Sequence, residues 1–218
     1  IETKYSGIAQ QVALTQLARR FSEYLVMDNA FSHIENAEKL MKRVGNEPTL
    51  MSYFSNQLDR ISAIKPGNIA PNITLPNRNG EPIALEQFRG KVVLLVFWGT
   101  WCPPCLTSIP KYLELQERFK FDEVEIVFIA LEARADDVSG WRNFIDGKGR
   151  IATQFLKGRP FPGVHLVALG QFHNPQVVPY AVNYAPSYVL IDKQGRISEP
   201  RVNLNEDLLV KIENLTRQ

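Results

Sequence analysis

The chain has 218 residues, of which 44% are hydrophobic and 22% are charged, and its formal net charge is +2. This balance excludes a protein dedicated to nucleic acid, which would carry a large excess of lysine and arginine. No apolar run approaches the roughly 18 residues of a membrane-spanning helix, so the composition fits a soluble globular protein. The sequence begins at Ile1 with neither Met nor an apolar leader. We therefore expect that a signal or anchor was removed, or that the sequence is part of a longer protein.

Residues 1–64 are predicted to form an N-terminal segment of about three helices, because apolar residues recur there at helical spacing. The three apolar groups run from Leu14 to Leu25, from Ala30 to Val44 and from Leu50 to Ile61. Thr49 is a candidate N-cap of the third helix. A segment of this size is marginal on its own, so we expect it to pack as a structural cap on the domain of residues 65–218. The alternative is a docking or dimerisation element.

The run from Lys91 to Trp98, Lys-Val-Val-Leu-Leu-Val-Phe-Trp, predicts a strand that is buried on both faces. A helix is predicted from Pro103 onward, because apolar residues continue at helical spacing and Pro103 and Pro104 can occupy the first turn. The apolar positions of that helix are Leu106, Ile109, Leu113 and Phe119. Cys102 is therefore expected at a helix N-terminus.

Cys102 and Cys105 are the only cysteines and form a CxxC behind that strand. The start of a helix stabilises a thiolate and lowers its pKa, so the spacing predicts dithiol chemistry. An exposed Cys102 would attack a substrate disulfide, and Cys105, about one helical turn later, would resolve the mixed disulfide. Pro103 and Pro104 stiffen this turn and remove backbone donors near the sulfurs, so they should influence the redox potential.

Three other interpretations of the cysteine pair are weaker. A structural disulfide gains little by closing so short a loop. A zinc site needs about four ligands, and the histidines available to it, His33, His165 and His173, show no ligand spacing. Haem attachment needs a histidine where this chain has Leu106. We therefore expect no metal and no bound cofactor, because the redox group is the Cys102–Cys105 pair itself.

At these residues the chain resembles the thioredoxin fold, and within it the TlpA/ResA-like thiol-disulfide oxidoreductases of the bacterial cell envelope, which are related to the AhpC/TSA and Redoxin proteins. The similar segments are Ala70 to Leu75, Asn77 to Gly80, Phe88 to Lys91, Trp101 to Cys105 and Tyr184 to Ile197. Pro110 falls inside the active-site helix, where thioredoxin-like proteins often have a helix-kinking proline. The resemblance implies an α/β thioredoxin-like fold, a central mixed β-sheet flanked by helices, preceded by the N-terminal helical segment.

The resemblance makes Pro186 the candidate cis-proline. A cis bond after Ala185 would let the Ala185 backbone face an extended substrate strand beside the thiolate. The alternative is an ordinary trans proline that opens an edge strand.

Two departures from the family pattern concern carboxylates. Val96 stands where many thioredoxins have a buried acid, and Ser108 stands where many TlpA/ResA-like proteins have glutamate. Such groups help to move the proton of the resolving thiol, so here water, Ser108 or a group from elsewhere would have to serve. Glu132 is a candidate substitute, although an acid at a strand end is more often solvated.

Farther along the chain, residues 124–131 predict a strand, and residues 136–144 predict a helix with Trp141 and Phe144 facing inward. The alternation of strands and helices implies parallel pairing. Residues 146–165 are a Gly-rich, basic insertion that could gate substrates, but a solvated surface loop is favoured. His165 and His173 are interpreted as structural or surface residues.

Two helix starts are predicted near the C-terminus. Asn174 followed by Pro175 resembles one start, and Asn203 with Glu206 resembles a capping box for the last helix.

The function predicted for the chain is that of a thiol-disulfide oxidoreductase. By resemblance it reduces disulfide-containing proteins of the periplasm or cell envelope and is recharged by a membrane-linked thiol electron donor. Trp101, directly before the nucleophile, is expected to contact substrate, whereas Phe97 and Trp98 are expected in the core. The oligomeric state is not defined by the sequence.

Two other functions compete with that of an oxidoreductase. A thiol peroxidase on this fold would need proline and threonine where the chain has Leu95 and Gly99. A binding or scaffold protein would use the N-terminal helical segment and leave the dithiol incidental.

Overall fold

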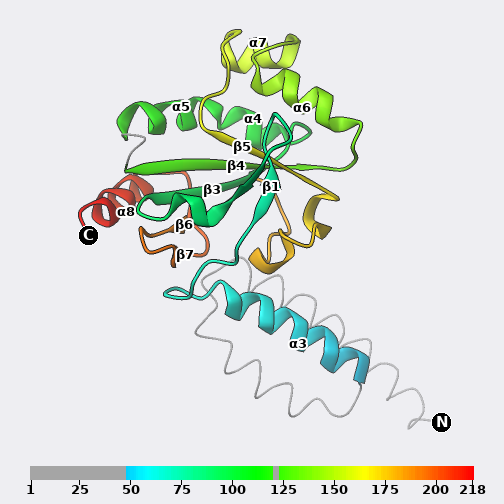
Figure 1. Cartoon of the computed structure of the whole chain (residues 1–218), viewed down its shortest axis with the longest axis vertical. Helices are drawn as coiled ribbons and strands as arrows, with labels where there is room; N and C mark the ends of the chain where they lie inside the picture. The colour runs from blue at the N-terminus through cyan, green and yellow to red at the C-terminus, as the bar shows by residue number, and fades with distance from the viewer. Residues whose placement is uncertain (1–47, 120–122) are drawn as a thin grey trace, which may run out of the picture.

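The computed structural model describes residues 48–119 and 123–218. Its centre is a five-stranded sheet in the order β5-β4-β3-β6-β7 (Figure 1). The strands are β3 (Val92–Trp98), β4 (Val124–Glu132), β5 (Val164–Leu169), β6 (Ser187–Ile191) and β7 (Ile197–Glu199). The first three are parallel, whereas β6 is antiparallel to β3 and β7 is antiparallel to β6. The predicted mixed sheet is therefore confirmed.

The two central strands are buried along their whole lengths. This burial is what a continuous apolar run produces when both faces of a strand are covered. Phe97 and Trp98, at the end of β3, lie on opposite faces of the sheet in two core clusters, so the prediction that they are core residues is confirmed. The motif that contains Cys102 follows immediately, at the carboxyl end of the central strand β3.

Helices cover one face of the sheet (Figure 1). They are α4 (Pro103–Thr107), α5 (Ile109–Arg118), α6 (Asp137–Ile145), α7 (Arg150–Leu156) and α8 (Glu206–Thr216). The active-site helix divides at Ser108 into α4 and α5, two residues before Pro110, which has no N–H to continue the helical ladder. Trp141 and Phe144 of α6 face the core as predicted.

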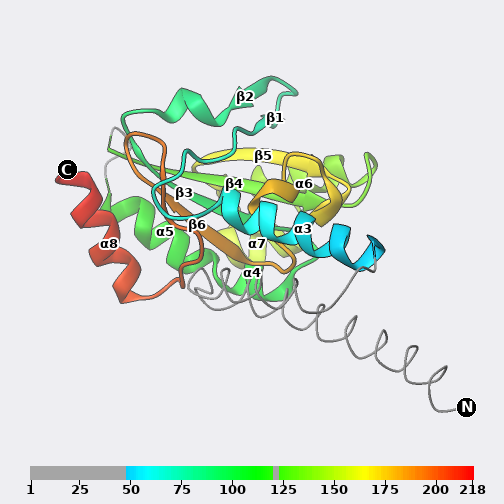
Figure 2. The same cartoon turned by 90° about the horizontal axis from the view of Figure 1, so that it is seen from below.

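The opposite face carries helix α3 (Pro48–Ala63), the hairpin of β1 (Thr74–Pro76) and β2 (Pro82–Ala84), and the 3₁₀ turns η2 (Leu85–Phe88), η3 (Gln171–His173) and η4 (Val178–Tyr180) (Figure 2). Leu58 and Ile61 of α3 are buried in the same core cluster as Tyr180 of η4. Within residues 48–119 and 123–218, no helix combines the length and the apolar character needed to cross a membrane.

Most of the predicted N-terminal helical segment lies outside the described residues, since its first two helices fall within residues 1–47. The third is α3. It begins at Pro48, so Thr49 lies inside its first turn and the predicted N-cap is wrong. Proline is favoured at the first helical position because its missing N–H would be unpaired there in any case.

The basic insertion is more ordered than a surface loop. Residues 150–156 form α7, and Ala152, Leu156 and Phe161 are buried against the helical face of the sheet. Apolar residues at these spacings draw the segment into the core, while its lysine and arginine side chains remain exposed as expected.

The two predicted helix starts are also wrong. Asn174 caps no α-helix, because its side chain accepts the Gln176 N–H in a local turn and only the 3₁₀ turn η4 follows. The last helix is capped by Asn205 instead of Asn203, and the Asn205 side chain accepts the Leu208 N–H at 3.3 Å.

Candidate active site

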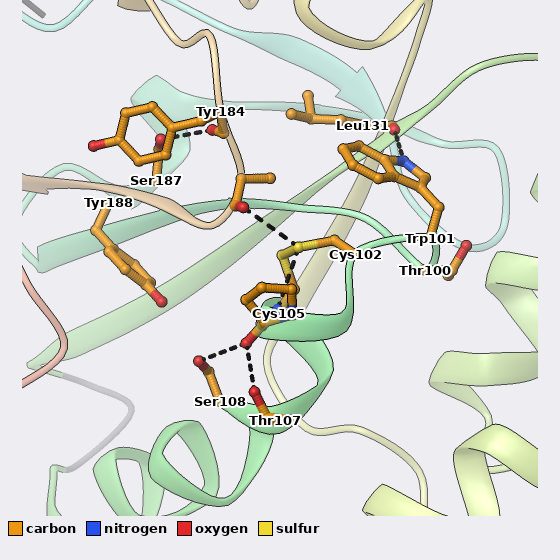
Figure 3. Close-up of a disulfide and its surroundings, with 12 residues drawn as sticks. Thr100, Trp101, Cys102, Cys105, Thr107, Ser108, Leu131, Tyr184, Ser187 and Tyr188 are labelled. Carbon is orange, nitrogen blue, oxygen red and sulfur yellow. Dashed lines mark hydrogen bonds between the residues drawn. A yellow bond between two sulfur atoms is a disulfide. The ribbon is translucent and has the colours of Figure 1, made fainter. Parts of the chain in front are cut away.

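The two cysteines form a disulfide at the N-terminus of α4 (Figure 3). Cys102 is the N-cap, and its sulfur accepts a hydrogen bond from the Cys105 N–H at 3.2 Å. Pro103 and Pro104 occupy the first turn, where their missing N–H groups leave no helical bond unmade. The helix start is therefore directed at the Cys102 sulfur, and this arrangement stabilises a thiolate there.

The two cysteines are both covered, in different surroundings. Cys105 is 0% exposed and Cys102 is 2% exposed, so the expectation of an exposed Cys102 is wrong for the oxidised protein. The Cys102 sulfur lies 3.5 Å from the carbonyl oxygen of Ala185, in the segment that leads into β6 (Figure 3). That segment contacts Cys102, whereas Cys105 belongs to the first turn of α4 and is fully buried.

The peptide bond between Ala185 and Pro186 is cis. Pro186 directly precedes β6, and the Ser187 hydroxyl donates to the carbonyl oxygen of Tyr184 at 2.7 Å. Tyr184 itself is 41% exposed. The structure thus brings together the two parts of the predicted site, the cysteine pair and the Ala185–Pro186 segment, from residues about 80 positions apart in the chain.

Trp101 lies on the surface beside the disulfide and is 44% exposed. Its indole Nε1 donates to the Leu131 carbonyl oxygen at 2.6 Å, and its ring meets the ring of Phe172 edge-on, with 6.2 Å between the centroids. Gly99 permits this fold of the turn, because a Cβ at that position would lie 2.4 Å from the indole nitrogen. The Trp101 ring is therefore held in place by these contacts, and its exposed surface can contact another molecule.

Glu132, at the end of β4, is 2% exposed, so the expectation of a solvated carboxylate is wrong. It accepts hydrogen bonds from the Thr100 N–H at 3.0 Å and the Thr100 hydroxyl at 3.2 Å. Burial raises the pKa of this carboxyl, and the bonds from Thr100 oppose that rise. Thr100 lies two residues before Cys102, so this buried acid holds the turn that leads to the nucleophile.

A group of hydroxyls lies next to α4, and of its members the sequence singled out only Ser108. The Tyr112 and Tyr188 hydroxyl oxygens are 2.9 Å apart in the core, and Tyr188 is paired with Val96 in the β3–β6 register. Ser108 is half-buried nearby (Figure 3). The available sequence signal was the spacing of Ser108 and Tyr112, four residues apart and hence on one face of a helix.

A metal site finds no support in the part of the chain that the structure describes, where no group of three or more histidine, cysteine, aspartate or glutamate side chains converges. His165 is buried among aromatic rings, and its Nε2 lies 3.1 Å from the Phe161 and Pro162 carbonyl oxygens. His173 is exposed on η3. Both are structural or surface residues, as expected.

Comparison with known proteins gives a consistent assignment. The model of the AhpC/TSA family matches residues 66–199. The thiol-disulfide oxidoreductase ResA of Bacillus anthracis is 34% identical over 134 residues, which is 61% of this chain and 67% of the relative. ResA of Bacillus cereus ATCC 10987 is 34% identical over 148 residues, which is 66% of this chain and 72% of the relative.

Solved structures of similar fold include a candidate thiol:disulfide interchange protein DsbE from Chlorobium tepidum, with 26% identity and a TM-score of 0.53 over 70% of this chain and 98% of that one. The C-terminal domain of a candidate thiol-disulfide oxidoreductase from Bacteroides thetaiotaomicron has 23% identity and a TM-score of 0.57, over 70% of this chain and 97% of that one. The second likeness supports the fold alone.

Proposed function

The chain belongs to the AhpC/TSA family and is a thiol-disulfide oxidoreductase, and on that premise we propose that it reduces disulfides in proteins of the cell envelope. Cys102 is the nucleophile that forms the mixed disulfide with substrate, and Cys105 resolves it. The observation that carries this assignment is the position of Cys102 as N-cap of α4, with a helix N–H on its sulfur, while Cys105, in the first turn of the same helix, is fully buried.

The substrate in this proposal is an extended peptide segment around a disulfide. It lies against the Ala185 backbone, which Pro186 holds 3.5 Å from the Cys102 sulfur. Backbone N–H and C=O groups such as those of Ala185 can hydrogen-bond an extended substrate strand whatever its side chains are. Trp101 forms one wall of the contact, since its exposed ring can bury an apolar side chain of the substrate. Pro103 and Pro104, which follow Cys102 and are exposed, complete the rim of the contact.

Turnover leaves the Cys102–Cys105 pair oxidised, so a second dithiol must restore it. We assign that role to a membrane-linked thiol electron donor. We place the protein in the cell envelope, and in the periplasm of a cell that has one. The likeness to the ResA and DsbE proteins and the resemblance to envelope oxidoreductases support this location.

The deciding experiment is a redox titration of the Cys102–Cys105 pair, by alkylation and mass spectrometry across a graded dithiol buffer. We expect a potential near −270 mV, the value typical of a reductant such as thioredoxin. A potential near −120 mV would instead indicate that the protein is an oxidant. If the pair forms no disulfide at any potential, the alternative of a binding or scaffold protein would be favoured. Peroxide consumption by the reduced protein, measured in parallel, would instead support the thiol peroxidase function.

A further inference from the structure

Cys105 has to lose and regain a proton in a place that water does not reach. The residue is 0% exposed and belongs to a core cluster with apolar neighbours such as Leu106 and Ile109. A thiolate without a partner in such surroundings is strongly disfavoured. The proton of the Cys105 thiol must therefore leave as its sulfur reacts, and a polar group in the cluster has to receive it.

The buried carboxylates of the described residues are committed elsewhere. Glu125, near the start of β4, pairs with Lys91 at 3.0 Å. Glu132, at the other end of β4, uses both oxygens on Thr100. Neither contact involves α4, the helix that contains Cys105.

Two phenols lie in the same core cluster as Cys105. Tyr112 is 1% exposed and Tyr188 is 7% exposed, and their hydroxyl oxygens are 2.9 Å apart. Burial raises the pKa of both phenols, so both are neutral at any working pH. Either oxygen can be the donor in the hydrogen bond between them, so the phenol that accepts keeps its own proton free for a further partner.

Ser108 links these phenols to the surface. Its hydroxyl donates to the Pro104 carbonyl oxygen at 2.9 Å, and its backbone N–H donates to the Cys105 carbonyl oxygen at 3.2 Å. Ser108 also lowers the pKa of both phenols and so opposes the rise that burial causes. Figure 3 shows Tyr188 reaching from β6 toward Ser108 and the first turn of α4. Three hydroxyls thus lead from the sealed core to a half-buried position.

We propose that the hydroxyls of Tyr112, Tyr188 and Ser108 form the proton route of the resolving thiol Cys105, an inference that rests on the proposed function. In the resolving step the Cys105 S–H gives up its proton to this route as its sulfur bonds to the Cys102 sulfur. The bond from Cys102 to the substrate sulfur breaks, and its electron pair leaves with the substrate. The cysteine pair is oxidised, the substrate is reduced, and solvent at Ser108 takes the proton that later reaches the substrate thiolate.

The route works without an ionised intermediate. Each hydroxyl can accept a proton on its oxygen while it passes its own proton to the next group. The groups that act electrostatically on the two phenols are each other, Ser108 and, for Tyr188, Tyr184. No lysine, arginine, histidine or carboxylate of the described residues is among them. A pH dependence of resolution therefore reports on Cys105 and its proton acceptor.

The test separates the two chemical steps with an aromatic disulfide whose released thiolate is coloured. Reduced full chain releases a first equivalent when Cys102 attacks, in a phase that depends on reagent concentration. It releases a second equivalent when Cys105 resolves the adduct, in a phase that does not. Tyr188→Phe and Ser108→Ala are compared with Tyr180→Phe, which removes an equally buried hydroxyl from the opposite face of the sheet, where it binds the Pro71 carbonyl oxygen.

We expect Tyr188→Phe to slow the second phase about tenfold or more and to leave the first phase within twofold of the parent, since proton transfer by a positioned group is worth at least that much. The remaining second phase should rise about tenfold per pH unit, because resolution then depends on the fraction of Cys105 that is already a thiolate. Ser108→Thr keeps a hydroxyl and should retain the parent rate. Tyr180→Phe should change neither phase.

Two results overturn the proposal. One is a second phase in Tyr188→Phe and Ser108→Ala that equals that of Tyr180→Phe at every pH. The other is a second phase that slows in Glu132→Gln instead, which would make that carboxylate the acceptor. Thermal unfolding of each variant shows whether it is folded, and Tyr112→Phe takes the place of Tyr188→Phe if that variant is not. Loss of the first phase in the parent would contradict the proposed function itself, independently of the proton route.

Discussion

Glu132 binds Thr100 through both carboxylate oxygens, at 3.0 Å to the Thr100 N–H and 3.2 Å to its hydroxyl. The backbone oxygen of Glu132 also accepts the Gly170 N–H at 3.0 Å. The end of β4 therefore fixes both the turn that leads to Cys102 and the chain that leaves β5. The Glu132 carboxyl that makes these contacts is buried, and its burial makes the stability of the protein depend on pH.

Glu132→Gln should remove one component of the pH dependence of stability. Burial raises the pKa of Glu132 above its ordinary value of 4.5, so between that value and its folded pKa the native state holds a proton that the unfolded chain releases. The free energy of unfolding therefore falls as the pH rises through this window. Glutamine can keep both contacts with Thr100 and does not titrate, so urea unfolding of the variant should lack this slope. Glu125→Gln, near the other end of β4, should retain it.

His165→Phe should remove a sensitivity to acid. Burial lowers the pKa of His165 from 6.5 to about 4. At pH values between these two, the unfolded chain therefore binds a proton at this residue and the native state does not. The free energy of unfolding then falls as the pH drops, by about 3 kcal/mol in all. Urea unfolding at several pH values should show this fall in the parent and in His173→Gln. A fall of the same size in His165→Phe would show that another group causes it.

Sequence alone predicted the parts of the molecule that depend on local pattern. The central strands are continuous apolar runs, and the CxxC with its two prolines carries its own helix start, so both follow from neighbouring residues. The surroundings of the cysteines depend on register across the sheet. Tyr188 belongs beside α4 because it pairs with Val96, and Glu132 is buried because β4 extends past the end of β3. No spacing of residues along the sequence predicts the position of Tyr188 or of Glu132.

Gly147→Ala should destabilise the protein through the segment that was expected to be a loop. Gly147 has a φ of +74°, and a Cβ there would lie 2.4 Å from the Arg159 carbonyl oxygen, so both the backbone conformation and the packing oppose a side chain. We expect a loss of about 2 kcal/mol or more in the free energy of unfolding. Gly140→Ala is the matched control, because it lies inside α6 with open space around it and should gain roughly 0.5–1 kcal/mol. Equal effects of the two substitutions would contradict this account of the insertion.

Trp101→Ala should impair the reduction of protein substrates and spare that of small disulfides. The indole is 44% exposed beside Cys102 and can bury apolar substrate surface, which a small disulfide does not present. Loss of such a contact is worth roughly 1–3 kcal/mol, or about tenfold to a hundredfold in kcat/KM for a protein disulfide. Val210→Ala, on an equally exposed apolar residue of α8, should change neither rate. A uniform loss with both kinds of substrate would instead point to a displaced Cys102.

Cys105→Ala should accumulate a mixed disulfide between Cys102 and its substrate, whereas Cys102→Ala should accumulate none. The reason is the asymmetry of the pair: the helix start favours a thiolate at Cys102, and Cys105 is 0% exposed in the apolar core. Mass spectrometry of each variant after incubation with an oxidised protein substrate measures the adduct. A double variant, Cys102→Ala with Cys105→Ala, sets the background. Equal yields from the two single variants would show that either sulfur can attack, and the assignment of nucleophile and resolving thiol would then be wrong.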